Sequence, residues 1–156
     1  MRIRRFVTAE KPDGSVHLRV DAAIPDTDTA VPATVLWGWD AMPKLPIGPD
    51  DLGPEHIDRP LFPSGGGASV NIVVFPPAGA APASSAEDTT AMHRTDTVDI
   101  LFVLEGEIVL QHPGCDDVTL SRGDVFVQNG AIHGWLNRSD QRCVMACVVL
   151  AADRAG

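Results

Sequence analysis

The sequence predicts an all-β fold, and three observations support this prediction. Fourteen glycines and thirteen prolines divide the 156 residues into short segments, which leaves little room for long helices. No segment of helical length shows a sustained spacing of apolar residues every 3.6 positions. Short apolar runs separated by turn residues recur through the second half of the chain, as in a β-sandwich or β-barrel. A chain of this length is expected to bury one main core.

The first predicted element is a β-hairpin near the N-terminus. Segments 4–10 and 16–24 are strand candidates on either side of the sequence KPDGS. The pair Asp13 and Gly14 suits the turn between them, because a tight hairpin turn needs positive φ. We therefore expect a two-stranded arm.

The middle of the chain is less regular. Segment 33–40 is a candidate third strand, whereas residues 42–67 are rich in proline, glycine and aspartate and are expected to form an irregular connection. Segment 69–75 (SVNIVVF) is predicted to be a strand, and a Pro/Ala/Ser/Gly-rich loop follows it to about residue 90.

Six further candidate strands complete the chain, at 98–104, 107–112, 117–120, 124–128, 134–137 and 143–150. Two of them contain almost continuous apolar runs, ILFVL and CVMACVVL. Such runs indicate that both faces of these strands are covered. We expect the barrel interior on one side, and a second subunit or the N-terminal arm on the other.

Charge and composition exclude several classes of partner. The net charge of −9, from 21 acidic and 12 basic residues, repels phosphate backbones and anionic lipid headgroups, so nucleic acid is not expected as a partner. No apolar run approaches the roughly 18 residues of a membrane span, and the N-terminus lacks the apolar core of a signal peptide. The three cysteines show no disulfide spacing. These features predict a cytoplasmic protein without membrane contact.

Three side chains near apolar strands could carry chemistry. His93 and Asp99 are six residues apart, so an extended chain directs both to the same face. His133 follows the strand candidate 124–128. If strands 98–104 and 124–128 face each other across a barrel, the three side chains can meet.

Two imidazoles and one carboxylate make a three-ligand metal site with open positions. Non-haem Fe(II) oxygenases use such a set, and it is also compatible with Mn, Ni or Zn. In the alternative interpretation the same residues are structural. His93 would cap a loop, and Asp99 would accept hydrogen bonds from the turn at 95–97. His133 would pack against Trp135, and spacing alone does not decide between the two interpretations.

Segments 92–110 (MHRTDTVDILFVLEGEIVL) and 118–140 (VTLSRGDVFVQNGAIHGWLNRSD) resemble the two motifs of the cupin family. The resemblance extends over roughly residues 68–150. It implies a cupin-type double-stranded β-helix, or jelly-roll barrel, over residues 61–156. Residues 1–60 would then be an N-terminal arm and an irregular connection that pack on the barrel or on a partner subunit, and the resemblance also implies a homodimer.

In the first motif the resemblance includes one departure. Asp99 lies seven residues before Gly106, at the position of the family's glutamate, and His93 matches the first histidine of the family's pair. The second histidine position falls on Thr95. The second motif matches at Gly123, Asp124, Gly130, His133 and Asn137. Gln128 stands where the family usually has proline.

The resemblance implies a divalent metal (Fe, Mn, Ni or Zn) held by His93, Asp99 and His133. It also implies a metal-dependent enzyme, with dioxygenase, isomerase, cyclase and lyase as the reaction classes, acting on an oxygen-bearing organic molecule. Asp96 and Gln128 are candidates for moving protons or orienting this substrate. The alternative is a non-catalytic cupin that binds a small ligand, and the threonine at the second histidine position favours it.

Overall fold

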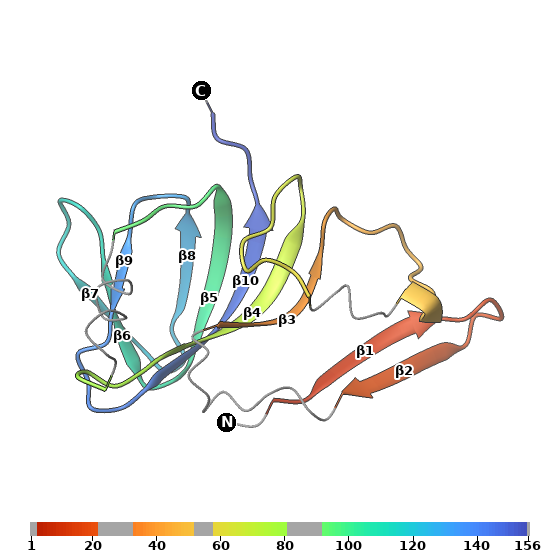
Figure 1. Ribbon diagram of the computed structural model, residues 1–156, viewed down its shortest axis with the longest axis horizontal. Coiled ribbons are helices and arrows are strands. Elements are labelled where there is room, and N and C mark those ends of the chain that lie inside the picture. The colour runs from red at the N-terminus through yellow and green to blue at the C-terminus, as the bar shows by residue number, and fades with distance from the viewer. Residues whose placement is uncertain (1–2, 22–32, 52–57, 81–91, 156) are drawn as a thin grey trace.

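The computed structural model describes residues 3–21, 33–51, 58–80 and 92–155, and these residues form an all-β structure (Figure 1). The elements are β1 (Arg5–Glu10), β2 (Val16–Asp21), β3 (Ala33–Trp39), the 3-10 helix η1 (Pro49–Asp51), β4 (Ala68–Phe75), β5 (Thr97–Glu105), β6 (Glu107–Gln111), β7 (Val118–Ser121), β8 (Val125–Asn129), β9 (Gly134–Leu136) and β10 (Cys143–Ala151). The predicted fold class is confirmed. Within the described ranges no helix has the length and hydropathy to cross a membrane, and all three cysteines are free thiols.

The predicted N-terminal hairpin is present as a two-stranded antiparallel sheet of β1 and β2. Gly14 has a φ of 80°, which is the positive φ that glycine was expected to supply in the hairpin turn. The Asp13 side chain accepts a hydrogen bond of 2.9 Å from Ser15 N and holds the turn. Figure 1 shows the hairpin to one side of the other strands. Glu10 N donates to Ile47 O (2.9 Å), which ties the arm to the connection before η1.

The remaining strands form two antiparallel sheets that face each other (Figure 1). One sheet has the order β3-β4-β10-β5-β8 and the other has the order β7-β6-β9. Their inner faces share one apolar core, built from Phe75, Leu101, Val103, Ile108, Leu110, Leu120, Trp135, Cys143, Met145, Cys147 and Val149. The division of the chain at residue 60 stays a prediction, and β3 on its N-terminal side pairs with β4.

Strands 98–104 and 124–128 do not oppose each other across the barrel, which was the condition stated for His93, Asp99 and His133 to meet. The corresponding strands, β5 and β8, are hydrogen-bonded neighbours in one sheet, with Asp99 opposite Gln128. The reason is that the β6–β7 hairpin belongs to the second sheet, after which the chain returns alongside β5. Gly123 N donates to Val103 O (2.9 Å), and Val103 N donates to Asp124 O (3.1 Å). These bonds start the pairing of β8 with β5.

The two apolar strands differ in how well they are covered. Most side chains of β10 are buried or half-buried on both faces, as its apolar run predicts. On β5, the outward-facing Phe102 and Leu104 are exposed, and so are Val125 and Val127 on β8. Within the described residues of one chain, the outer face of β5 and β8 is therefore uncovered, and its cover by a second subunit stays a prediction.

Candidate functional site

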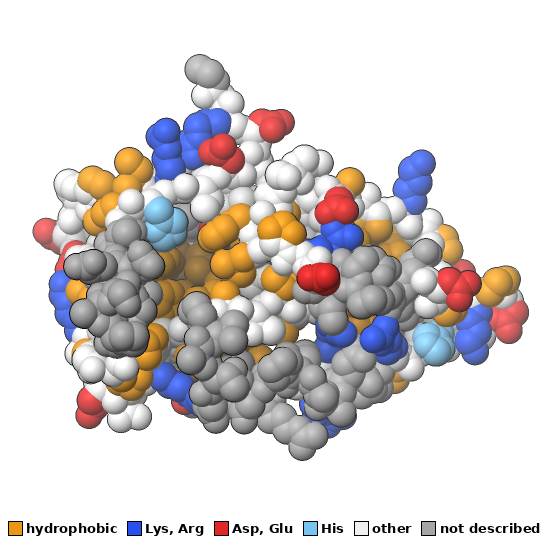
Figure 2. Space-filling model, viewed as in Figure 1, with side chains coloured by type: hydrophobic (Ala, Val, Ile, Leu, Met, Phe, Trp, Pro, Cys, Tyr) orange, Lys and Arg blue, Asp and Glu red, His pale blue; other side chains and the backbone are white. Residues whose placement is uncertain are grey.

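A cavity of about 240 Å³ opens between the two sheets, and His93, Asp99 and His133 all contribute to its lining. Most of its wall is apolar and comes from Val73, Phe75, Leu101, Trp135, Met145 and Val149. Figure 2 shows a hollow in this face of the molecule, floored by apolar side chains and with a histidine at its edge. The cavity thus combines a water-excluding wall with a small group of polar side chains, the usual composition of a small-molecule site.

The two histidines are joined through their backbones. His93 N donates to His133 O and His133 N donates to His93 O, both at 2.9 Å, in an isolated antiparallel bridge. Their rings lie 4.4 Å apart between centroids. This bridge links the segment that enters β5 to the segment that leaves β8. His93 is exposed, whereas His133 is 3% exposed, so His93 lies at the mouth of the cavity.

The ring of His133 is held in one tautomer. Its Nδ1 lies 3.0 Å from the carbonyl oxygen of Ala131, and a carbonyl can only accept, so Nδ1 carries the proton. Burial lowers the pKa of His133, and the nearby His93 lowers it further, while the bond to Ala131 and the charge of Asp99 oppose this. His133 is therefore a neutral imidazole with its Nε2 lone pair free to bind a metal or accept a proton. Its ring also packs edge-on against Trp135, 5.7 Å between centroids.

Asp99 is an inward-facing carboxylate on β5 and is only 6% exposed. Burial raises its pKa, while a hydrogen bond with Thr97 and the charges of His133 and His93 act in the opposite direction. Its Oδ1 atom is buried and has no hydrogen-bond partner among the described residues. Buried polar atoms are nearly always paired, so this oxygen is available to a ligand or a metal.

Gln128 lies directly opposite Asp99 on β8 and is 2% exposed. Its Nε2 is also buried without a hydrogen-bond partner among the described residues. An unpaired donor and an unpaired acceptor thus occupy facing positions on two neighbouring strands.

Gln128 is not among the residues that line the cavity, and neither is the other sequence-predicted candidate, Asp96. Asp96 is exposed and accepts a 2.6 Å ion-pair bond from Arg154 Nε. Asp96 is three residues from Asp99, and side chains an odd number of positions apart point to opposite faces of an extended chain. Thr97 and Asp99 therefore point inward and Asp96 points to the other side. Thr95 Oγ1 lies 2.7 Å from Thr97 Oγ1. The second histidine position of the cupin motif is therefore occupied by a hydroxyl that bonds to its neighbour.

The three predicted ligands fit a divalent cation in chemical type, since they comprise a neutral imidazole, an unpaired carboxylate oxygen and a second imidazole. Their placement alone does not form a metal cluster. Across the described ranges no three His, Cys, Asp or Glu side chains lie close enough to hold an ion together. The metal-ligand roles of His93, Asp99 and His133 therefore stay a prediction.

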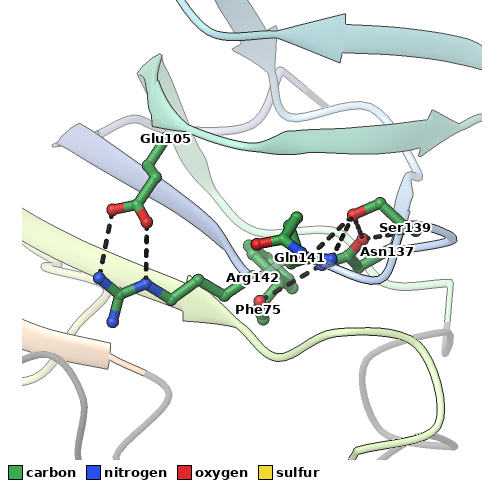
Figure 3. Close-up of polar contacts among 6 residues, drawn as sticks. All are labelled: Phe75, Glu105, Asn137, Ser139, Gln141 and Arg142. Carbon is green, nitrogen blue, oxygen red and sulfur yellow. Dashed lines mark hydrogen bonds and ion pairs between the residues drawn. The ribbon is translucent and has the colours of Figure 1, made fainter.

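Asn137 matches the second cupin motif, and its side chain holds the fold around the site (Figure 3). Its Nδ2 donates to Pro76 O at 2.9 Å and to Gln141 O at 2.8 Å. Its Oδ1 accepts a 2.9 Å bond from Ser139 N. The end of β4 is thereby fastened to the turn that precedes β10.

Sequence reasoning missed Asn71, a fully buried residue on β4 that also lines the cavity. The argument used for Asp99, that a polar residue inside an apolar strand needs a partner, applies equally to the asparagine of SVNIVVF. That signal was present in the sequence.

Comparison with known proteins gives a family and several relatives. The model of the Cupin domain family matches residues 72–149. The chain is 29% identical to "Oryzines biosynthesis cluster protein J" of Aspergillus oryzae, over 95% of this chain and 82% of that protein. It is also 40% identical to "Phomopsin biosynthesis cluster protein C'" of Diaporthe leptostromiformis. This match covers 47% of this chain and 34% of that relative's length.

The comparison with solved structures found these two among others. A cupin domain from Bordetella pertussis has a TM-score of 0.40 and 22% identity, covering 55% of this chain and 82% of that one. The DMSP lyase DddQ from Ruegeria pomeroyi has a TM-score of 0.43 and 19% identity, covering 57% of this chain and 40% of that one.

Proposed function

The chain belongs to the cupin family, and from this premise we propose that it is a metal-dependent enzyme acting on a small oxygen-bearing organic molecule bound in the barrel cavity. The observation that carries this proposal is the buried, unpaired Oδ1 of Asp99 in the same cavity as the neutral ring of His133. Leaving a buried carboxylate oxygen without a partner is costly. A bound cation would offset this cost.

His93, Asp99 and His133 would hold the ion, with Fe, Mn, Ni or Zn as candidates. A bound divalent ion would polarise a substrate oxygen or, if it is iron, support chemistry with dioxygen. The chain's own groups have separate roles. Ala131 O keeps the His133 lone pair on Nε2. The unpaired Nε2 of Gln128 lies on β8 opposite Asp99, where it would orient that carboxylate.

The apolar wall supports the choice of a small organic substrate, because it excludes water and strengthens the few polar contacts at the ligand. The fungal relatives are named as biosynthesis cluster proteins, which supports a role in making or modifying a small molecule. Within this role the reaction classes are those of a dioxygenase, an isomerase, a cyclase or a lyase.

A second candidate function is a non-catalytic cupin that holds a small ligand in the same cavity. Two observations favour it. Thr95 stands at the position of the family's second histidine and bonds to Thr97, and the described residues contain no ready-made cluster of three metal ligands.

Metal analysis of tag-free protein tests the first proposal. Protein stripped with chelator and reloaded with Fe(II), Mn, Ni or Zn should bind about one ion per chain. His133→Ala and Asp99→Asn should each abolish this binding, while His17→Ala on the hairpin serves as the matched control and should retain it. Correctly folded wild-type protein that binds none of the four ions would contradict the enzyme proposal and support the binding module.

The oxygenase branch has its own measurement. The Fe(II)-loaded protein is mixed with a panel of diketones, catechols and hydroxyketones, and oxygen uptake is recorded. Uptake that depends on both the compound and His133 is expected if the protein is a dioxygenase. Conversion of a compound without oxygen uptake assigns the isomerase, cyclase or lyase classes instead.

A further inference from the structure

A buried amide on β4 lies in the cavity wall and has no part in the function proposed above. Asn71 is fully buried and lines the same cavity as His93, Asp99 and His133. It is not a neighbour of Asp99, because β10 lies between β4 and β5. Asn71 therefore belongs to a different part of the cavity wall.

Hydrogen bonds determine which way this amide points. Asn71 Nδ2 donates to Leu61 O at 3.2 Å and to Ser69 Oγ at 3.0 Å, and Ser69 Oγ in turn donates to Leu61 O at 2.8 Å. A backbone carbonyl can only accept, so a flipped amide would bring two acceptors together at Leu61. The nitrogen is therefore bound within the wall, and Oδ1 is the atom that remains.

Asn71 Oδ1 is buried and has no hydrogen-bond partner among the described residues. Its neighbours across the sheet are Val35 on β3 and Cys147 on β10. Valine has no side-chain donor, and a thiol is a weak one. Burial raises the pKa of the Cys147 thiol to about 12, so it stays protonated and uncharged. A buried amide oxygen in this setting lacks the bond that such oxygens nearly always make.

We propose that Asn71 Oδ1 is an anchor for the ligand and accepts a hydrogen bond from a hydroxyl or amine group of it. The identification of the cavity as the ligand site rests on the proposed function, but the anchor does not require a metal. The two strands that carry Asn71 and Asp99 are two strand spacings apart, and their partners on β10, Cys147 and Val149, are two residues apart. The two backbone positions are therefore separated by roughly 12 Å.

This arrangement defines a substrate class. β10 lies between the two polar positions, and there it lines the cavity with Cys147 and Val149. The cavity, at about 240 Å³, is smaller than the usual range for drug-sized ligands, which begins at about 300 Å³. The expected ligand is a short bifunctional molecule. It has an oxygen group facing Asp99 and the histidines, an apolar middle, and a hydroxyl or amine that reaches Asn71.

Paired ligands test the anchor directly. Butanamide, hexanamide and octanamide are compared with their terminally hydroxylated and terminally aminated counterparts by calorimetric titration, on both zinc-loaded and metal-free protein. At one chain length or more, the hydroxylated or aminated compound should bind the wild type at least about tenfold more tightly than its methyl-terminated analogue, because it satisfies the buried oxygen.

Variants then assign this discrimination to Asn71. Asn71→Leu should bind the analogues of each pair equally, and Asn71→Asp should favour the aminated compound. Asn129→Leu, on the exposed end of β8, is the matched control and should leave the discrimination unchanged. If Asn71→Leu does not fold, Asn71→Ala removes the oxygen without adding bulk.

The outcomes separate this inference from the proposed function. Discrimination that depends on Asn71 in metal-free protein would support the anchor even if the protein binds no metal. Equal binding of all analogues by the wild type, or binding of none of them, would overturn the anchor whatever the metal content.

Discussion

At the scale of single residues, burial of the Asp99 carboxylate lowers the free energy of unfolding at neutral pH. Burial raises its pKa, so the folded state keeps the proton to higher pH than the unfolded state does. In the unfolded state an aspartate has a pKa of about 3.9. Above that value the unfolded state binds fewer protons than the folded state. The contribution of Asp99 to the free energy of unfolding therefore falls as pH rises through this window and is unfavourable at neutral pH.

We accordingly expect Asp99→Asn to raise the free energy of unfolding of metal-free protein at neutral pH by about 1–3 kcal/mol. This gain should shrink as pH falls toward the ordinary carboxyl range. Urea unfolding in the presence of chelator, followed from about pH 5 to pH 8, measures both effects.

Asp117 provides a control, because its pKa is shifted in the opposite direction to that of Asp99. Hydrogen bonds from Gln111 and Arg138 lower the pKa of this exposed carboxylate, so it contributes stability above its unfolded pKa, which is lost as pH falls through its folded value. Asp117→Asn should therefore weaken the fold at neutral pH. If Asp99→Asn also lowers the free energy of unfolding at neutral pH, burial of the Asp99 carboxylate does not destabilise the fold as argued above.

At the scale of elements, the turn between β5 and β6 depends on close packing against the start of β10. Gly106 has a φ of 73°, and a Cβ at this position would collide with the carbonyl oxygen of Arg142. The Arg142 side chain makes two bonds to Glu105, at 3.1 and 3.2 Å, as Figure 3 shows. Backbone and side chain thus hold this turn against β10.

Gly106→Ala should therefore destabilise the protein by more than the cost of placing a non-glycine residue at positive φ, because the new Cβ also collides with Arg142 O. Gly114 is the matched control, because its φ is 76° and no atom lies within 4 Å of an added Cβ. We expect a loss of about 1–2 kcal/mol for Gly114→Ala, the cost of a left-handed non-glycine residue, and a clearly larger loss for Gly106→Ala. Equal shifts of the urea midpoint would show that the approach to Arg142 is unimportant.

At the scale of the whole molecule, two exposed apolar surfaces remain in a single chain. The hairpin presents Phe6, Val16 and Leu18 on one face, and the outer face of β5 and β8 presents the cross-strand pair Phe102 and Val125. An isolated hairpin is at best marginally stable, and a contiguous apolar patch usually marks an interface. We propose a homodimer in which the hairpin of each subunit covers this outer face of its partner.

Light scattering coupled to gel filtration should give twice the chain mass at micromolar concentration. Leu18→Arg and Phe102→Arg should each shift the protein to a monomer, since a charge cannot be buried cheaply in an apolar interface. Val118→Arg, at an exposed position on β7, is the control and should remain dimeric. A monomeric wild type would refute the dimer.

Local sequence patterns were enough to predict the elements. The Asp13-Gly14 turn and the alternating or apolar runs identified every strand to within a few residues, because turn chemistry and strand periodicity act over a few neighbouring positions. The same two-residue period put His93 and Asp99 on one face, and both line the cavity. It also explains why Asp96 points elsewhere, although that consequence was not drawn from the sequence.

The order of the strands was decided only by the tertiary structure. Nothing in segments 98–104 and 124–128 distinguishes neighbours in one sheet from strands opposed across a barrel, because pairing depends on how distant segments close the sheets. The same long-range packing buries Gln128 beside Asp99 and Asn71 across β10, and leaves one polar atom of each residue unpaired. Short-range patterns are thus sufficient for the strands and for the residue types available for chemistry, whereas the packing of the two sheets selects which of those residues line the cavity.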